Sequence, residues 1–577
     1  GPKPPTGARG MARRLCVVVF LAAAASSEDA VGSHDSELLD RFAELERMVQ
    51  SQQRMIESQA GLIETQQGRI LNLESHTASS GASADVVNRR LQTGVAKSIY
   101  EPSGSGGYSE LESTQGAMTH VWLLLCGALV VSMHAGFAMV KVGSCRAVSA
   151  QSILLASLLD VCLATLGWWV SGWAIAFSGP MSLEADGLMY KKLRVAGYEQ
   201  FAGHQFLGAR SSSPGRTSTT RSDGQVEPTF DMVRWFFQWA CCTVATTIVS
   251  GGVCERVLAP GHAIYVFLMA ACIYPVIVAC TKGMGLLATE VNSIGFTDFA
   301  GSGIIHLTGG VGSLIGSIAV GARKGRFDRP KEFAPHNMPL VVLGTFLLWF
   351  GWYGLNCGST MAMNTIENGF MAAQVAMNTT LGAATGGLVA FLMRSVGFRK
   401  YDVAGFCNGI LAGLVAVSGS CGNVECGFAC IIGGVGAFLY VGTSWLMRRI
   451  QVDDPVDAFA VHGAAGAWGV VAAAVFDWGA VGSSFNKFHG HNGFRCAFTP
   501  GTNECMTGLE TDGIVANFVE IGVVFVWVGV ASVVILLPLR FCGLLRASED
   551  KQELGQDEFL HRPVKAYVIE PFLSSKP

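Results

Sequence analysis

The sequence predicts an all-α membrane protein: eleven transmembrane helices with pseudo-twofold inverted repeats, preceded by an N-terminal coiled-coil segment. Three observations lead to this fold class. The 577 residues are 50% hydrophobic and only 14% charged, with a mean hydropathy of +0.39, which is far from the composition of a soluble domain. Eleven apolar segments follow residue 115. A short histidine–glycine pattern recurs in two segments that cross the membrane in opposite directions.

Charge and glycine content fit a protein whose surroundings are a lipid membrane. The formal net charge is only -3, and the basic residues form short clusters between apolar runs, so we expect no nucleic-acid partner. The 71 glycines predict closely packed helices, because lipid gives little hydrophobic drive for helix association and packing must supply it.

Residues 1–30 are predicted to be a signal peptide region. From Met11, a basic start is followed by a short apolar run and small residues, as in a secretory signal. The run is too short for a membrane span, which needs about 20 residues, so we favour a cleaved signal. An anchor or an organelle-targeting segment is the alternative.

Residues 35–75 are predicted to form a coiled coil. Apolar residues recur there every seven positions, at Phe42, Val49, Ile56, Ile63 and Ile70. Gln52, Gln59 and Gln66 occupy the second seam position, which weakens a coil but is compatible with a defined register. A single amphipathic helix without a partner is the alternative. A Ser/Gly-rich linker, residues 76–114, leads into the membrane region.

Residues 115–540 are predicted to form the transmembrane domain. Its apolar segments lie near 117–140, 149–178, 232–253, 260–281, 298–320, 338–357, 366–393, 403–419, 427–447, 458–477 and 514–539. If a signal peptide places the N-terminus outside, an odd number of spans makes the tail, residues 541–577, cytoplasmic. The short loops on that side then carry the expected positive charge, as in the loop with Arg323, Lys324 and Arg326. We expect a multi-pass protein of the plasma membrane, with an organelle membrane as the alternative.

The positions of the cysteines allow disulfides but do not indicate a metal site. Cys496 and Cys505, and also Cys421 and Cys426, fall in loops predicted to lie outside, where disulfides can form. No cysteine pair has zinc-site spacing with histidines, so we expect no metal and no cofactor.

Ionisable side chains inside membrane spans are costly, so each is a candidate functional residue. Asp160, Asp298, His306 and His462 stand out, with His134 as a lesser candidate. His306 and His462 are each followed by a glycine four residues later. Five spans separate the two patterns, so their helices run in opposite senses and could bring two imidazoles together at one pore. Two adjacent imidazoles in a low dielectric cannot both be charged cheaply, but they can share one proton and pass it on.

Several long motifs resemble the ammonium transporter (Amt/Mep/Rh) family, and most closely its plant-type Amt branch. They are TDFAGSGIIHLTGG, HNMPLVVLGTFLLWFGWYGLNCGS, MNTTLGAATGG, DVAGFCNGILAGLVAVSGSCGNVE and DDPVDAFAVHGAAGAWG. The resemblance covers roughly residues 115–567 and leaves out the N-terminal coil. It implies an eleven-helix protomer with pseudo-twofold halves, assembled as a homotrimer with one pore in each subunit.

The resemblance also implies a function and a set of site residues. His306 and His462 match the paired pore histidines, Asp298 matches the acidic residue behind the external ammonium site, and Ser359 matches a hydroxyl at that site. In the family, ammonium is captured outside and loses its proton, and ammonia crosses while the histidines relay the proton. A carboxylate at a helix start also caps backbone N–H groups, so Asp298 has a purely structural alternative.

Three aromatic positions of the family depart in this chain. Cys241 and Leu355 occupy the positions of two stacked phenylalanines that form the outer gate, and Thr281 or Lys282 occupies the position of the external-site tryptophan. Each aromatic face attracts an ammonium-like cation by about 0.5–2 kcal/mol, so these losses should weaken recruitment, and Lys282 should repel a cation. Trp235 or Trp239 could substitute from a shifted position.

The tail is similar to the regulatory tail of the family through Gly555, Asp557, His561 and Tyr567, with Phe559 at the position of its phosphorylatable threonine. Asp160 matches a position that is also acidic in the plant branch, and we expect a structural role there. We expect His134 to be a packed or hydrogen-bonded core residue.

The leading prediction is therefore a transporter of ammonium, moved as ammonia plus a relayed proton. An ammonium sensor with little flux and a passive channel for neutral gases such as ammonia or carbon dioxide are the alternatives. We do not expect an enzyme, since no nucleophile is paired with a base in an accessible cleft.

Overall fold

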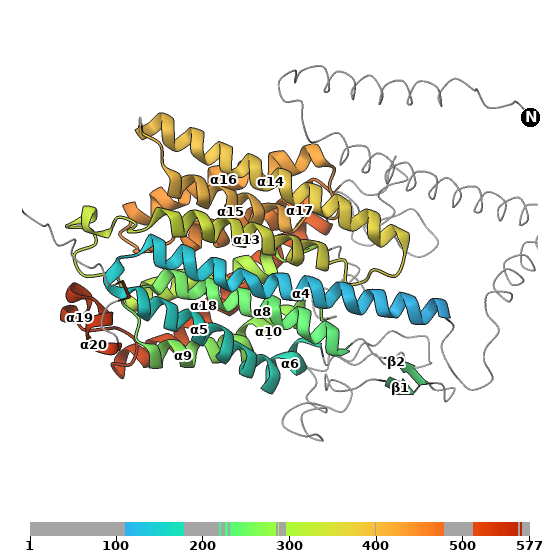
Figure 1. The fold of residues 1–577 in the computed structure, drawn as a ribbon, viewed down its shortest axis with the longest axis horizontal. Coiled ribbons are helices and arrows are strands. Elements are labelled where there is room, and N and C mark those ends of the chain that lie inside the picture. The colour runs from blue at the N-terminus through green and yellow to red at the C-terminus, as the bar shows by residue number, and fades with distance from the viewer. Residues whose placement is uncertain are drawn as a thin grey trace, which may run out of the picture. The chain divides into compact units, whose positions relative to one another are not determined.

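The computed structural model describes residues 110–177, 218–220, 226–228, 231–283, 287, 296–398, 400–477, 512–562 and 566–567. The expected signal peptide region, the coiled coil and residues 76–109 of the linker lie outside these ranges. Helix α4 (Glu110–Ser144) begins within the range expected to be linker. Within residues 108–577 the helices run side by side as a bundle (Figure 1).

Each of the eleven expected apolar segments corresponds to a helix or to a helical run interrupted by a π-helical turn. The runs are α4; α5 (Ala150–Gly167), π-helical turn Trp168–Gly172 and α6 (Trp173–Phe177); α8 (Asp231–Val253); α9 (Ala259–Leu268), π-helical turn Met269–Ile273 and α10 (Tyr274–Cys280); π-helical turn Ser302–Leu307 and α12 (Thr308–Val320); α13 (Met338–Gly358); α14 (Ile366–Phe398); α15 (Val403–Ser418); α16 (Cys426–Arg449); π-helical turn Phe459–Ala464 and α17 (Ala465–Val475); and α18 (Asp512–Phe541). In the described part of the chain, nine runs are long and apolar enough to span a membrane, and Val403–Ser418 and Phe459–Val475 are shorter apolar helices.

Side-chain caps define several helix ends. The Asn337 side chain accepts a hydrogen bond from the Leu340 N–H at the start of α13, and Asp402 does the same for the Gly405 N–H at the start of α15. Helix α12 ends at Gly321, whose φ of 83° lies in a region that glycine adopts without a Cβ penalty. Polar residues at the ends of apolar runs therefore define where these spans begin.

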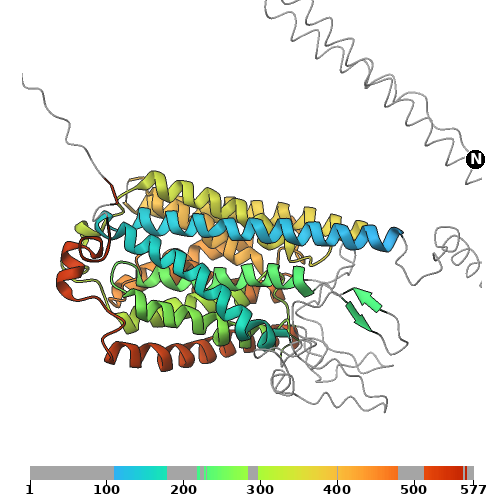
Figure 2. The same cartoon turned by 60° about the horizontal axis from the view of Figure 1, so that its bottom comes forward.

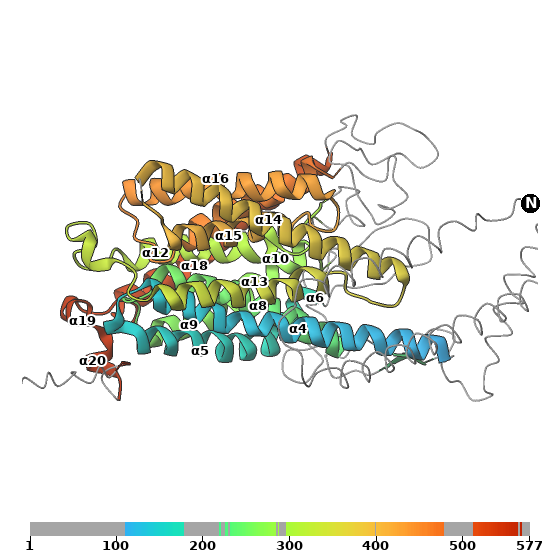
Figure 3. The same ribbon diagram turned by 45° about the horizontal axis from the view of Figure 1, so that its top comes forward.

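The bundle packs as groups of neighbouring helices. Helix α4 lies along α13, and α14 packs against both α15 and α16 (Figures 1 and 3). Helix α12 packs between α8 and α18, which Figure 2 shows in red along the lower edge of the bundle. The main apolar core runs through these contacts, and it includes Trp168, Trp352 and Tyr440, all fully buried.

Shorter elements complete the described structure. One end of the bundle carries two 3₁₀ turns, Ala147–Ser149 and Pro330–Phe333, and two tail helices, α19 (Glu549–Leu554) and α20 (Gln556–Leu560). Helix α20 contacts the start of α5. Strands β1 (Ser218–Thr220) and β2 (Val226–Pro228) form an antiparallel ribbon with Ser218 opposite Pro228, Thr219 opposite Glu227 and Thr220 opposite Val226. The described fold is thus helical apart from this one ribbon.

Candidate functional site

The two histidines that the repeated motif singled out lie against each other in the interior. Their Nδ1 atoms are 3.3 Å apart, and their rings stack with centroids 5.3 Å apart and planes inclined by 25°. His306 is fully buried and His462 is 4% exposed. A hydrogen bond between two Nδ1 atoms needs a proton on one of them and a lone pair on the other. The contact therefore suits a pair that shares one proton.

The backbone around the pair explains how two distant motifs meet. His306 lies in the π-helical turn Ser302–Leu307 and His462 in the π-helical turn Phe459–Ala464. Each turn packs against the helix that follows the other turn, so the two segments run antiparallel, as the inverted-repeat pattern predicted. The π-helical turns themselves were not predicted, although such turns are frequent at functional sites.

The glycines of the motif allow this crossing. A Cβ on Gly310 would overlap the backbone of Gly463, and a Cβ on Gly466 would lie 2.7 Å from the Ser302 carbonyl oxygen. Each glycine is thus the point where its helix touches the backbone of the other. The histidine and the glycine of each motif act together, because the glycine brings the backbones close enough for the imidazoles to touch.

Aromatic rings flank the pair. His306 stacks on Trp352 with centroids 4.9 Å apart, and Phe137 lies 5.9 Å from the ring centre of His462. His306 Nε2 has no hydrogen-bond partner among the described residues. The rings are therefore held by packing on their faces, while one nitrogen of the pair stays available.

Asp298 caps the segment that carries His306. One carboxylate oxygen accepts hydrogen bonds from the N–H groups of Gly301 and Ser302 at 2.8 Å, and the other accepts from Gly303 and Ile304 at 2.9 and 3.0 Å. Gly301 has a φ of 98°, which directs the chain into the π-helical turn. The structural role left open for Asp298 is thus present in the geometry.

The second histidine segment has a corresponding acid that the sequence analysis missed. Asp454 precedes His462 by the same eight residues that separate Asp298 from His306, and its Oδ2 accepts a hydrogen bond from the Phe459 N–H at 2.7 Å. Burial and the neighbouring Asp457 carboxylate raise the pKa of Asp454 to about 7. The repeat therefore extends to an acid, a histidine and a glycine at equal spacing.

Glu520 of α18 is a second buried acid that the sequence analysis missed. It is fully buried, and neither of its carboxyl oxygens has a hydrogen-bond partner among the described residues. A Cβ on Gly303 would overlap its Oε1, so Glu520 lies against the turn that carries His306. The signal available in the sequence was a glutamate inside the apolar run 514–539.

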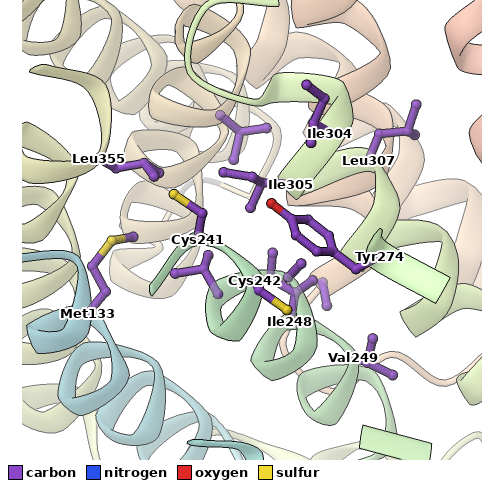
Figure 4. Close-up of a cluster of buried hydrophobic side chains, with 14 of the residues drawn as sticks. Met133, Cys241, Cys242, Ile248, Val249, Tyr274, Ile304, Ile305, Leu307 and Leu355 are labelled. Atoms are coloured by element: carbon purple, nitrogen blue, oxygen red, sulfur yellow. The ribbon is translucent and has the colours of Figure 1, made fainter. Parts of the chain in front are cut away.

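The two outer-gate positions lie in the apolar core. Cys241 of α8 is 3% exposed and Leu355 of α13 is fully buried. Figure 4 shows the Cys241 sulfur directed toward Leu355, with Ile304 and Ile305 of the His306 turn on the neighbouring side. Aliphatic and sulfur atoms therefore fill the place where the family resemblance led us to look for two aromatic rings.

The external-site positions carry polar groups bonded to backbone. Lys282 Nζ donates a hydrogen bond of 2.9 Å to the carbonyl oxygen of Phe299, the residue after Asp298. Thr281 donates to the Ile277 carbonyl at 2.7 Å, and Ser359 donates to the Leu355 carbonyl at 2.9 Å. Trp239 bonds to Thr165 at 2.9 Å and stacks on Trp235, so both indoles have defined local contacts.

The tail residues dock on the end of the bundle. The Asp557 carboxylate accepts hydrogen bonds from the N–H groups of Gln151 and Ser152 at 2.8 and 2.9 Å, and His561 bonds to the Ser152 hydroxyl at 2.9 Å. Gly555 has a φ of 98° and packs on Val148, while the Tyr567 ring lies 5.6 Å from that of His336. The tail thus contacts the loop between α4 and α5, the start of α5 and the loop before α13.

His134 and Asp160, two other ionisable residues of the apolar segments, both have buried polar partners. His134 is hydrogen-bonded to the Thr243 hydroxyl at 2.8 Å, as expected of a core histidine, and Asp160 is buried in a polar cluster with Lys141 and His262. Cys421 and Cys426 are both free thiols, so the disulfide considered for them is wrong; Cys421 Sγ instead donates to the Ser418 carbonyl. Cys496 and Cys505 lie outside the described residues.

Comparisons with known proteins agree with this architecture. Residues 121–566 match the model of the Ammonium Transporter Family. The chain is 30% identical over 470 residues to "Ammonium transporter 1 member 3" of Solanum lycopersicum, covering 78% of this chain and 93% of that one, and 32% identical over 397 residues to "Ammonium transporter Amt2" of Archaeoglobus fulgidus, covering 67% and 77%.

The fold is also similar to the folds of solved structures. The crystal structure of Saccharomyces cerevisiae Mep2 is similar with a TM-score of 0.62 at 26% identity, covering 82% of this chain and 99% of that one. The fold of a "Sensor Amt Protein" is similar with a TM-score of 0.61 at 24% identity, covering 77% and 98%. With a family match over most of its length and relatives at this identity, the chain belongs to the ammonium transporter family.

Proposed function

We propose that this chain transports ammonium by deprotonating it at the outer face, conducting ammonia through the bundle, and relaying the proton through His306 and His462. The observation that carries the proposal is the 3.3 Å contact between the two Nδ1 atoms in a buried site. A proton shared there can move from one ring to the other without a fully hydrated ion entering the interior.

The surroundings of the pair support conduction of a neutral molecule. Apolar side chains cover the outer side at Cys241, Leu355 and Ile305, so a bare cation would pay a large desolvation cost on this route. On the other side of the pair, His462 lines a cavity of about 20 Å³ whose walls are mostly apolar. Ammonia, which is neutral, suits such a route better than ammonium.

The finer features of the resemblance are part of the same proposal. The protein acts as a homotrimer with eleven spans in each subunit, in the plasma membrane, with the tail in the cytoplasm. Asp298 fixes the His306 turn and adds negative potential behind the external ammonium site, where Ser359 supplies a hydroxyl. Gly555, Asp557, His561 and Tyr567 dock the regulatory tail.

The proposal is tested with His306→Ala and His462→Ala in purified protein reconstituted into liposomes. Proton transfer by a positioned side chain contributes about 10²–10⁴-fold, so each variant should lose at least about 100-fold of the ammonium-evoked current. His120→Ala, in the first half of α4, serves as the matched control and should keep the wild-type current. Uptake of labelled methylammonium is measured on the same preparations.

The two measurements separate the alternatives. Current together with uptake supports the proton relay. Uptake without current in the wild type would instead assign the chain as a neutral-gas channel. If the folded protein shows neither current nor uptake, the chain would be assigned as a sensor.

A further inference from the structure

A buried polar cluster in the first half of the bundle has no part in the function proposed so far. Asp160 of α5 is fully buried, and it accepts hydrogen bonds from His262 on Oδ1 at 2.7 Å and from Thr247 and Ser250 on Oδ2 at 2.9 and 2.7 Å. Lys141 Nζ donates to Asp160 Oδ2 at 3.3 Å, to Thr247 at 3.1 Å and to Ser250 at 2.7 Å. Four helices, α4, α5, α8 and α9, thus meet at one carboxylate.

Two cavities touch this cluster from different sides. The cavity beneath His462 encloses about 20 Å³ and is lined by Phe137, Lys141 and Thr247 as well as His462. A second cavity of about 20 Å³ is lined by Lys141, Ser250, Glu255 and Gln556 of the tail. A cavity needs roughly 10–15 Å³ on this measure to hold a water molecule, so each has room for one next to a hydroxyl.

Two residues whose hydroxyls donate to the same carboxylate oxygen therefore line the two cavities, one residue in each. Thr247 faces the cavity shared with His462, Ser250 faces the cavity at the tail end, and both donate to Asp160 Oδ2. Ionisable groups inside membrane spans often mark proton pathways, and here the groups lie in series.

We propose that Thr247, Asp160 and Ser250 form a proton-exit branch, through which the proton relayed by the histidines leaves the ammonia route and reaches the end of the bundle that carries the tail. This inference rests on the proposed function and adds to it the path that the proton takes after His462. Lys141 is a positioning residue, because its ammonium group holds the three oxygens together.

The transfer balances as a chain of O–H exchanges. Water in the first cavity receives the relayed proton from His462 and gives a proton to Thr247 Oγ1, whose own hydrogen passes to Asp160 Oδ2. The protonated carboxyl then donates to Ser250 Oγ, which releases its hydrogen to water in the second cavity beside Glu255. One proton enters and one leaves, and each hydroxyl rotates to restore the starting arrangement. Because Lys141 is positive, the protonated cluster carries a net charge and releases the proton readily.

The test uses Thr247→Val and Ser250→Ala in the full-length protein, reconstituted into liposomes that contain a pH-sensitive dye. After a jump in external ammonium, a wild type that moves ammonia and a proton together gives a current and little change in lumenal pH. Each variant should lose the current and show lumenal alkalinisation instead, because ammonia still enters but its proton does not. Protein-free liposomes give the background entry of ammonia.

Two further variants separate a proton path from a structural role. Thr246→Val makes the same change one residue earlier on α8, at a hydroxyl that donates to the Thr243 carbonyl of its own helix at 2.8 Å, and it should behave as wild type. Thr247→Ser keeps the hydroxyl and should restore the current. Wild-type current in both Thr247→Val and Ser250→Ala overturns the branch, as does joint loss of current and ammonia entry. A wild type with neither signal overturns the proposed function itself.

Discussion

In the proposed mechanism, Lys282 places a positive charge close to the point where ammonium arrives. Its Nζ donates to the carbonyl of Phe299, next to Asp298, so the charge lies close to the segment that leads to His306. Two unit charges about 8 Å apart at an effective dielectric constant of about 40 repel by about 1 kcal/mol. We therefore predict that Lys282→Met lowers the KM for ammonium by about fivefold, measured as the concentration dependence of the current.

The matched variant Lys282→Arg keeps the charge and should keep the wild-type KM. The advantage of Lys282→Met should also shrink in high salt, because ions screen an exposed charge. A higher KM for Lys282→Met would mean that the lysine aids recruitment, for instance by ordering the Phe299 carbonyl, and an unchanged KM would mean that its charge does not affect recruitment.

At the residue scale, the repeated histidine–glycine pattern predicted site residues better than the presence of single ionisable residues did. His306 and His462 were found because one pattern occurred twice, and the structure places them in contact. Lys141, His262 and Glu520 were missed, although His262 and Glu520 lie within expected apolar segments and Lys141 directly follows one. A single sequence shows that such a residue is costly but does not show its partner, because the partners lie 19 to 109 positions away, as for Lys141 with Asp160 and Ser250.

At the scale of helices, the crossing of the two histidine segments depends on glycine. A Cβ at position 310 would overlap the backbone of Gly463, which cannot yield as a flexible side chain can. We predict that Gly310→Ala lowers the stability by about 1–3 kcal/mol, as for other overpacked interiors, and abolishes the current by separating the imidazoles. Thermal unfolding in detergent and current recordings measure the two effects.

Gly442→Ala on α16 is the matched control. Nothing lies within 4 Å of a Cβ at that position, so the substitution should leave the current unchanged and stabilise the helix by about 0.5–1 kcal/mol. Wild-type current in Gly310→Ala would show that the helices can shift without separating the rings.

The positions of the helices could be predicted from the sequence, but their interruptions could not. Hydropathy reports which residues avoid water, and each expected apolar segment contains a helix or helical run. A π-helical turn changes only the hydrogen-bond partner of a few residues, as in Ser302–Leu307, and leaves the hydropathy of the run unchanged. The register of the histidines was therefore set by a feature that composition does not encode.

At the scale of the whole molecule, the charged loops and the tail form one structure. Arg323 pairs with Asp453 and Glu255, and Lys324 pairs with Glu549 of α19 at 2.7 Å. The Glu549 carboxylate raises the pKa of Lys324, and Lys324 lowers the pKa of Glu549 in return. The loop with Arg323 and Lys324 thus also binds the tail, so the two lie at the same end of the bundle, as the six helical runs between them, α13 to α18, require.

The coiled coil predicted for residues 35–75 concerns the assembly of subunits. Glutamine at seam positions favours a defined register over strength, so the coil should contribute modestly to holding three subunits together. We predict that deleting residues 35–75 lowers the temperature at which the proposed homotrimer dissociates in detergent, whereas the current of each subunit stays near wild type because each contains its own histidine pair. Replacing Gln52, Gln59 and Gln66 by Leu should shift that temperature in the opposite direction, since apolar seams bind more strongly. Native mass spectrometry during heating measures both shifts, and a truncated protein that stays trimeric to the wild-type temperature would exclude this role for the coil.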